Sequence, residues 1–403
     1  MPERVRDVFI VDALRTPIGR LGGALARERP DDLAGAVISS LVARNPNLDP
    51  AALDDVIFGD ANGAGEDNRN VARMAVLLAG LPTSVPGVTV NRLCGSGMQA
   101  VIDAARSIAT GDAEVCIAGG VESMTRAPYV LPKAEQPFPR ADATLYSSTL
   151  GWRMVNPRLC PQWTVALGEG AELLAERFGI DREAQDRFAL ESHHKAASAW
   201  DAGAFSDEVV SLAGVSLARD ESIRSDTSLD QLARLRPVFR PEGTVTAGNA
   251  SPLNDGAAAL LVASEQAIAR HGLRPLARVA SRAVSGIDPQ LYGLGPVEAA
   301  ERALQRAGIA WADLSVLELN EAFAAQALAC LSHWKAIDPA IVNPKGGAIA
   351  IGHPLGCSGA RLLATLAWQL VRRGGGYGLA TMCIGVGQGI AVVLEAADGS
   401  GER

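Results

Sequence analysis

The chain alternates between two kinds of hydrophobic segment. Short runs rich in β-branched and small residues, such as 114–120 (EVCIAGG) and 378–387 (GLATMCIGVG), are predicted to be buried central strands. Ala- and Leu-rich runs with amphipathic spacing, such as 94–109 and 357–371, are predicted to be helices. Strands that alternate with such helices are typical of an α/β protein with a mostly parallel sheet and helices on its faces.

The same series of segments occurs twice, which indicates an old duplication of a strand, helix, strand unit. The first copy contains VIFGDAN (56–62), CGSGMQAVIDAARSIA (94–109) and CIAGG (116–120), and the second contains VLELNEAF (316–323), CSGARLLATLAWQLV (357–371) and CIGVG (383–387). We therefore expect two similar halves that share one cleft. The helices that start near 94 and 357 should face one another through their N-terminal ends.

Residues 125–251 differ in composition and hydrophobic pattern from the rest of the chain. They contain Pro-rich turns, a long polar helical run and a stretch rich in Arg and Asp. This segment is too long for a loop and is predicted to be an inserted subdomain over one edge of the cleft. The apolar, strand-like run 257–264 then returns to the composition of the first half. The predicted domains are therefore residues 1–124 with 252–276, the insertion 125–251, and a second half at 277–403.

Composition narrows the classes of function. The chain has 403 residues and a net charge of −8, and only 4% of its residues are aromatic, which argues against a nucleic-acid or membrane-surface binder. It contains no run of about 20 apolar residues, and from its first and last residues we expect neither a secretory leader nor a C-terminal address. Its six cysteines are scattered without a C-x-x-C pair, so they are predicted to be free thiols in a cytoplasmic protein.

Cys94 stands where a predicted strand meets a predicted helix, in a turn with Gly95 and Gly97. The N–H groups at a helix N-terminus stabilise a thiolate and lower the pKa of the thiol, and the glycines allow close approach of a substrate or another chain. The alternative is a small buried residue at a strand end.

A histidine in the second half offers Cys94 a partner. His353 lies in a Gly/Pro turn just before the corresponding helix, and a pseudo-twofold arrangement would bring it opposite Cys94 as the base for a thiol nucleophile. A metal site at His353 and Cys357 would have only two ligands, so no metal is predicted. Cys383 could form a disulfide, act as an acid or base, or only pack. Asn320 and Glu321 could polarise a carbonyl and hold a neighbouring group, or cap a helix.

Five motifs, NRLCGSGMQAV, GTVTAGNASPLNDGAAAL, LNEAFA, GGAIAIGHPLGCSGAR and MCIGVGQG, together resemble the thiolases that act on 3-oxoacyl-CoA. GEDNRNVARMAVLLAGLP and LGWRMVNP also resemble the 3-oxoadipyl-CoA branch of that family. The resemblance implies two similar mixed-sheet halves in α-β-α-β-α layers with an inserted loop domain. It also implies CoA and acyl-CoA as substrates, no tightly bound cofactor, and a homodimer or homotetramer.

The resemblance also implies roles for five residues. Cys94 would accept the acyl group as a thioester, and His353 would deprotonate it. Cys383 would be the acid/base at the carbon that leaves as acetyl-CoA. His353 and a water held by Asn320 would form one oxyanion hole, and the N–H groups of Cys94 and Gly385 would form the other.

Further residues are assigned to ligand binding by the same resemblance. Ser251 would contact the pantetheine, Arg224 the adenine nucleotide, and Ala322 and Phe323 would also border CoA. Some positions around the substrate tunnel depart from the family pattern and leave the preferred acyl chain open: Ala166, Leu167, Gly170, Leu173 and Tyr292.

The sequence therefore predicts a degradative thiolase. The alternatives are a biosynthetic acetoacetyl-CoA thiolase, a decarboxylating ketoacyl synthase, which should carry His or Asn in place of Cys383, and a non-catalytic CoA- or lipid-binding module.

Overall fold

The computed structural model describes residues 6–397. The predictions that the chain has no leader and no C-terminal address concern residues 1–5 and 398–403, and these two stretches lie outside the described residues. The main sheet has the strand order β10-β11-β12-β9-β1-β8-β5-β3-β4, with β2 paired to β8. Its strands are β1 (Val8–Arg15), β2 (Gly19–Arg20), β3 (Asp55–Gly59), β4 (Gly87–Val90), β5 (Val115–Ser123), β8 (Asn254–Ser264), β9 (Ala277–Gly286), β10 (Leu314–Leu319), β11 (Tyr377–Ile384) and β12 (Gln388–Ala396).

The sheet consists of two half-sheets with the same pairing pattern. β1 and β9 join them through only two residue pairs, Phe9 with Arg278 and Ile10 with Ala277. From this junction outward, each half has two antiparallel pairs and then a parallel one: β1-β8-β5-β3 in the first and β9-β12-β11-β10 in the second. The predicted duplication therefore extends to the topology.

The prediction of a mostly parallel sheet was wrong, because each half-sheet is mixed. The short turn Gly385–Gly387 connects β11 directly to β12, and a connection of that length can join only antiparallel strands. Alternating strands and helices along the sequence do not reveal which strands return through a hairpin.

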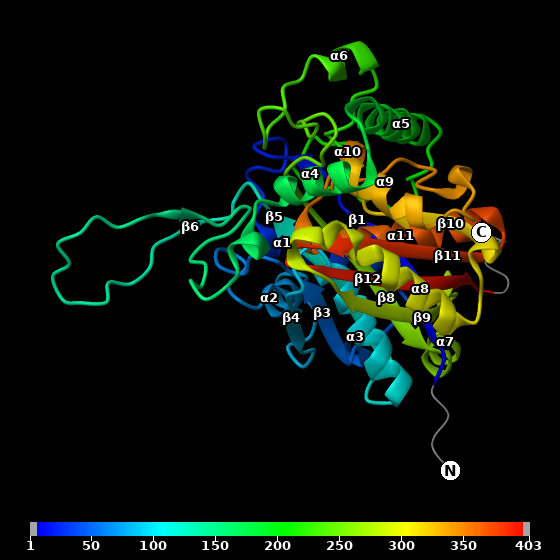
Figure 1. Ribbon diagram of the computed structural model, residues 1–403. Coiled ribbons are helices and arrows are strands. Elements are labelled where there is room, and N and C mark those ends of the chain that lie inside the picture. The colour runs from blue at the N-terminus through cyan, green and yellow to red at the C-terminus, as the bar shows by residue number, and fades with distance from the viewer. Residues whose placement is uncertain (1–5, 398–403) are drawn as a thin grey trace.

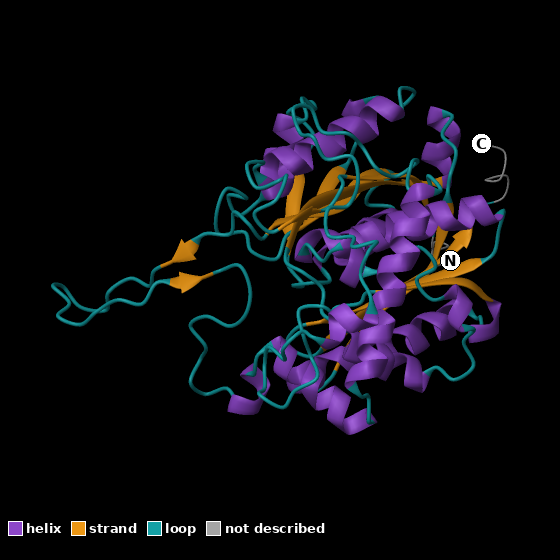
Figure 2. Cartoon of the chain, turned by 90° about the horizontal axis from the view of Figure 1, so that it is seen from above, coloured by secondary structure: helices purple, strands orange, loops and turns teal. Residues whose placement is uncertain are grey.

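Helices fill the space between the half-sheets and cover their outer faces, so that five layers form (Figure 2). The central helices are α3 (Ser96–Thr110) and α11 (Leu355–Arg373). The outer helices are α1 (Pro30–Arg44), α2 (Val71–Leu78) and α7 (Glu265–His271) on the first half, and α8 (Gly295–Ala307) and α9 (Ala324–His333) on the second. Residues 356–371 of α11 are buried without interruption, as expected for a helix enclosed on all sides.

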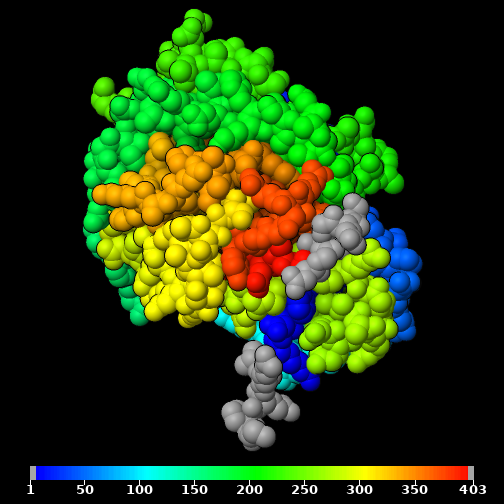
Figure 3. Space-filling model, turned by 90° about the vertical axis from the view of Figure 1, so that its right-hand side faces the viewer, coloured from blue at the N-terminus to red at the C-terminus, as the bar shows by residue number. Residues whose placement is uncertain are grey.

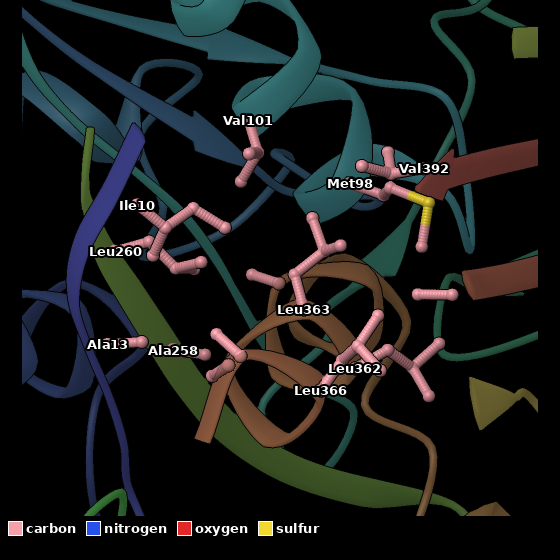
Figure 4. Close-up of a cluster of buried hydrophobic side chains, with 14 of the residues drawn as sticks. Ile10, Ala13, Met98, Val101, Ala258, Leu260, Leu362, Leu363, Leu366 and Val392 are labelled. Carbon is pink, nitrogen blue, oxygen red and sulfur yellow. The ribbon is translucent and has the colours of Figure 1, made fainter. Parts of the chain in front are cut away.

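The central core lies between the two half-sheets. Figure 4 shows Leu362, Leu363 and Leu366 of α11 directed toward α3 and the strands around it, and the same buried cluster includes Met98, Val101, Ile10, Ala13, Ala258, Leu260 and Val392.

Glycines bring the N-terminal ends of α3 and α11 into contact. A Cβ at Gly97 would lie 2.5 Å from the carbonyl oxygen of Gly356, and one at Gly359 would overlap the backbone of Met98. The expected meeting of the two helix starts is therefore confirmed, and it depends on the absence of side chains there.

The insertion forms a cap and a projecting ribbon. Helices α4 (Leu167–Phe178), α5 (Arg182–Asp201) and α6 (Leu229–Ala233) cap one end of the half-sheets, next to α10 (Ala348–Ile351), and strands β6 (Tyr129–Val130) and β7 (Tyr146–Ser147) form the base of a long arm (Figure 1). Figure 3 shows the cap, in green, resting on the second half of the chain. Short 3-10 helices occur at Pro50–Ala52, Pro161–Thr164, Pro289–Leu294, Trp311–Asp313 and Pro339–Ile341.

The long polar helical run predicted within the insertion is present as α5, and the predicted strand at 257–264 is present as the end of β8. The domain boundaries at 124, 251 and 276 remain predictions. No helix within residues 6–397 has both the length and the apolar character needed to span a bilayer.

Candidate active site

A cavity of about 410 Å³ lies where the two halves and the cap meet. Seven of the nine predicted site residues line it: Cys94, Ser251, Ala322, Phe323, His353, Cys383 and Gly385. They come from both halves and from the end of the insertion, so the shared cleft expected from the duplication exists.

Cys94 lies in a tight turn between β4 and α3. The preceding residue, Leu93, has a φ of +48°, which is uncommon for a residue with a side chain. Its N–H donates to the side-chain oxygen of Asn91 at 2.9 Å, and its carbonyl accepts from the hydroxyl of Ser96 at 2.6 Å. These two bonds fix the turn that places Cys94 at the cavity wall.

The thiol of Cys94 is buried, and burial raises its pKa to about 11. The N–H groups of Gly385 and of Cys94 itself donate to the sulfur and act in the opposite direction, but they do not compensate for the loss of water. The prediction of a lowered pKa was therefore wrong for the free thiol. A base must remove the proton when the reaction begins.

His353 is held in one tautomer by its neighbours. The hydroxyl of Ser358 donates to the carbonyl of Pro354 at 2.8 Å, so at its 2.6 Å contact with Nδ1 of His353 it accepts. The hydrogen therefore lies on Nδ1 and the lone pair on Nε2. The backbone N–H of His353 donates to Asn254 Oδ1 at 2.9 Å, which fixes the main chain as well.

Burial and the positive charge of Arg361 lower the pKa of His353 to about 3, so the imidazole is neutral. Its Nε2 lies 3.5 Å from Nδ2 of Asn320, and Asn320 Oδ1 is buried with no hydrogen-bond partner among residues 6–397. A ligand or a water can therefore engage this amide. Asn320 thus lies beside His353, although it does not line the cavity itself.

Glu321, next to Asn320, is buried and accepts hydrogen bonds from Ser192 Oγ at 2.6 Å and from Asn343 Nδ2 at 2.8 Å. It ties the Asn320 turn to the cap and to the segment before α10. This is the holding role considered for it from the sequence, and its carboxylate also accepts from the N–H of Ile349 at 3.2 Å, in the first turn of α10.

Cys383 lies near the end of β11, in a buried cluster with Tyr292 and Ala322. Burial, together with the nearby Cys94, raises the pKa of Cys383 well above its usual value. Both cysteines also affect Tyr292, whose pKa is raised by burial first. All six cysteines are free, so the prediction of thiols is confirmed and a Cys94–Cys383 disulfide is excluded from this structure.

Two departures from the family pattern compensate for each other. The ring of Tyr292 occupies the space next to Gly170, where a Cβ would lie 2.7 Å from Tyr292 Cε1. The Tyr292 hydroxyl donates to the carbonyl of Leu167 at 2.8 Å. Ala166 and Leu167 line the cavity, whereas Leu173 does not. The tunnel wall is therefore repacked around a tyrosine.

The ligand-binding residues divide into two groups. The N–H and the hydroxyl of Ser251 both donate to the carbonyl of Ala322 at 3.0 Å, and the ring of Phe239 packs edge-on against Phe323 at 6.3 Å. These residues form the mouth of the cavity. Arg224 is exposed and does not line it. Its backbone N–H donates to Nδ1 of His193 at 3.2 Å, and its carbonyl accepts from the N–H of Thr227 at 3.4 Å.

Ser358 and Asn254 were missed as supports of His353. Both lie inside motifs that the sequence singled out, and the available signal was a hydroxyl five residues after the histidine. Within residues 6–397 no three or more His, Cys, Asp or Glu side chains gather as a metal site would require. The chemistry that this geometry supports is acyl transfer to a thiol, with a neutral imidazole as base and two N–H groups for an oxyanion.

Comparison with known proteins agrees with this geometry. The thiolase N-terminal domain family matches residues 8–266, and the thiolase C-terminal domain family matches residues 273–396. The 3-oxoadipyl-CoA/3-oxo-5,6-dehydrosuberyl-CoA thiolase of Escherichia coli K12 is 54% identical over 97% of this chain and 100% of its own length. The β-ketoadipyl-CoA thiolase of Pseudomonas putida is 53% identical with the same coverage.

Solved structures agree as well. Human mitochondrial 3-ketoacyl-CoA thiolase in complex with CoA superposes with a TM-score of 0.92 and 40% identity, over 98% of this chain and 99% of the other. The acetyl-CoA acetyltransferase of Bacillus anthracis superposes with a TM-score of 0.91 and 40% identity, over 98% and 100%. Since the family matches and the relatives cover nearly the whole chain, this protein belongs to the thiolase family.

Proposed function

We propose that this protein cleaves 3-oxoadipyl-CoA with CoA, giving acetyl-CoA and succinyl-CoA through an acyl group on Cys94. The observation that carries the proposal is the placement of Cys94, His353 and Cys383 around one cavity, with the Cys94 and Gly385 N–H groups directed at the sulfur. The names of the relatives that are more than 50% identical support the acyl group.

In the first half-reaction, Nε2 of His353 takes the thiol proton of Cys94, and the sulfur attacks the C3 carbonyl. The N–H groups of Cys94 and Gly385 hold the resulting oxyanion. The C2–C3 bond then breaks, and its electron pair forms the enolate of acetyl-CoA. His353, now protonated, and a water on Asn320 stabilise the enolate oxygen while the Cys383 thiol protonates C2.

In the second half-reaction, the Cys383 thiolate takes the proton from the thiol of CoA. The CoA sulfur attacks the succinyl thioester, and the N–H groups of Cys94 and Gly385 hold the oxyanion again. The Cys94 sulfur leaves and recovers its proton from His353, so both cysteines and the histidine return to their first states. Coenzyme A is thus a substrate, and no other cofactor takes part.

The test is thiolysis of 3-oxoadipyl-CoA, acetoacetyl-CoA and a medium-chain 3-oxoacyl-CoA, each with CoA. We expect the highest kcat/KM for 3-oxoadipyl-CoA. A higher value for acetoacetyl-CoA would favour the biosynthetic alternative, with which the Bacillus anthracis neighbour is consistent. No thiolysis of any of the three would refute the enzyme assignment.

Two variants separate the roles of the cysteines. Cys94→Ala should accept no acyl group from an acyl-CoA in an intact-mass measurement. Cys383→Ala should still be acylated, but it should not exchange the α-hydrogens of acetyl-CoA with deuterated solvent. The reverse pattern would contradict the assignment.

For CoA itself we propose that Ser251, Ala322 and Phe323 border the pantetheine and that Arg224, an exposed cation outside the cavity, meets the nucleotide phosphates. Arg224→Gln should raise the KM for CoA without changing the KM for N-acetylcysteamine, a thiol that lacks the nucleotide. Equal effects on both thiols would contradict this role.

We also propose a homodimer or homotetramer in the cytoplasm. The arm between β6 and β7 carries exposed apolar side chains, among them Phe138 with 95% exposure, and the edge strand β4 exposes Val88. Light scattering coupled to size exclusion would test this, with a monomer as the refuting result. The six free thiols support a reducing compartment, and cell fractionation tests that location.

A further inference from the structure

A second, smaller cavity of about 150 Å³ adjoins the first at Cys94. The two share Leu150, Gly151, Trp152, Leu167, Leu355 and Gly385 as well as Cys94. The smaller cavity does not include His353 or Cys383, which line only the larger one. An acyl group on the Cys94 sulfur can therefore extend into the smaller cavity, away from the groups that handle protons.

Most of the polar groups that line this smaller cavity already have partners. Nδ2 of Asn62 donates to the carbonyl and the hydroxyl of Ser148, at 3.2 and 3.0 Å, whereas Oδ1 of Asn62 is buried with no hydrogen-bond partner among residues 6–397. Oε2 of Glu122 accepts from the N–H groups of Ala61 and Gly356, both at 2.9 Å.

Arg153 is the positively charged group of this wall. Among the described residues that line the cavity it is the only Lys or Arg, and its half-buried guanidinium makes no hydrogen bond or ion pair with any residue of 6–397. A positive charge without a protein partner, next to an otherwise largely apolar wall, is suited to a ligand anion, because no carboxylate of the described residues bonds to it.

The segment that carries Arg153 is anchored. The neighbouring Trp152 lines both cavities, and its ring N–H donates to the carbonyl of Val165 at 2.9 Å, just before α4. The backbone of Arg153 is therefore held against the cap rather than left on a free loop.

We propose that Arg153 binds the terminal carboxylate of the acyl chain and so selects dicarboxylic 3-oxoacyl substrates over monocarboxylic ones of equal length. This inference rests on the proposed thiolysis and specifies its substrate class. A succinyl group on the Cys94 sulfur places its carboxylate about 6 Å from that sulfur, a distance that stays within a cavity bordered by both residues. A butyryl group of the same length would present a methyl group to the guanidinium instead.

The test compares 3-oxoadipyl-CoA with 3-oxohexanoyl-CoA, which differ only in having a carboxylate or a methyl group at C6. In Arg153→Gln, the ratio of the two kcat/KM values should fall by about 10- to 100-fold, as expected for the loss of a charge-assisted hydrogen bond. Arg153→Lys, which keeps the charge but not the paired donors, should lose less. Arg158→Gln is the matched control, because Arg158 lies in the same segment outside both cavities, and its ratio should match the wild-type ratio.

An unchanged ratio in a folded Arg153→Gln protein would overturn the inference, including the case in which both substrates lose activity equally. In that outcome the proposed thiolysis still stands. If the wild-type protein cleaves 3-oxohexanoyl-CoA but not 3-oxoadipyl-CoA, the proposed substrate and the inference fail together. Intact-mass rates of Cys94 acylation by succinyl-CoA and butyryl-CoA give the same comparison without carbon–carbon chemistry, and only the succinyl rate should depend on Arg153.

Discussion

Replacing Ser358 by alanine tests how His353 is prepared as a base. The Ser358 hydroxyl is the acceptor for the Nδ1–H of His353 at 2.6 Å, and this bond keeps the lone pair on Nε2. Ser358 is fully buried in the first turn of α11, so solvent cannot replace it freely. Alanine removes the acceptor and leaves the rest of the turn in place.

The expected cost follows from leaving a buried donor without a partner, which is about 1–3 kcal/mol. If the imidazole keeps its hydrogen on Nδ1, it pays this cost in the ground state. If the hydrogen moves to Nε2, the base is lost until it returns. In both cases the barrier rises, and kcat for thiolysis should fall by about 5- to 150-fold.

The assay is steady-state thiolysis together with the rate of Cys94 acylation measured by intact mass. Both rates should fall, because His353 acts in the acylation step. Ser285→Ala is the control, since Ser285 is also buried and donates to a backbone carbonyl, that of Gly295 at 2.7 Å, but lies outside both cavities. A Ser358→Ala enzyme that keeps kcat within twofold, or a Ser285→Ala enzyme that loses as much, would refute the tautomer argument.

Three further predictions concern other parts of the site. Asn320→Ala should lower kcat by about 10²- to 10³-fold with a smaller change in KM, as expected for an oxyanion-hole group, and a loss below threefold would contradict that role. Gly170→Ala should lower the free energy of unfolding in urea by about 1–3 kcal/mol, because its Cβ meets the Tyr292 ring, and Tyr292→Met should restore part of it; no change in either would contradict the packing. Burial lowers the pKa of His193 to about 4, so the unfolded chain binds a proton there between about pH 6.5 and pH 4 that the folded chain does not. The stability that His193 contributes is therefore lost as the pH falls through this range, and His193→Gln should lose less stability than the wild type between pH 7 and pH 4.5.

The sequence predicted the elements that depend on local pattern. The run at 114–120 is part of β5, and that at 378–387 is strand only as far as Ile384, where the turn to β12 begins. The runs at 94–109 and 357–371 are helices, although α3 and α11 begin at Ser96 and Leu355. Their hydrophobic spacing is fixed within each segment, so no distant contact is needed to infer it. The shared cavity of Cys94 and His353 also followed, because it depends only on the duplication.

The features of the site that the sequence did not predict depend on contacts between residues far apart in the chain. The raised pKa of Cys94 reflects how deeply the folded chain buries the thiol, whereas the sequence reveals only that a helix follows. The packing of Tyr292 against Gly170 joins residues more than 100 positions apart, so each looked like an isolated departure from the family pattern. The unpaired guanidinium of Arg153 likewise becomes visible only when the fold shows which groups surround it.

The structure also revises how the two halves correspond. The sequence aligned Cys94 with Cys357, but the positions two residues before the two central helices are Cys94 and His353. The nucleophile and its base therefore occupy equivalent places, and the close contact of the helix starts brings them to one cavity.

The same correspondence holds at the strand ends. Glu122 and Cys383 are the second-last residues of β5 and β11, and Asp60 and Asn320 directly follow β3 and β10. Burial raises the pKa of Asp60 and Glu122, to about 9 and about 7, so the first half keeps buried acids at these positions. In the second half the same positions hold a thiol and an amide, which are uncharged in the resting enzyme and can donate a proton or a hydrogen bond. Burial first, and then the charge of Glu122, already raise the pKa of Cys94. A further carboxylate at the second-half positions would add to the opposition to the thiolate and the enolate. The duplicated frame thus supplies three pairs of equivalent positions, and the proposed catalytic set takes one of the first-half members and all three of the second.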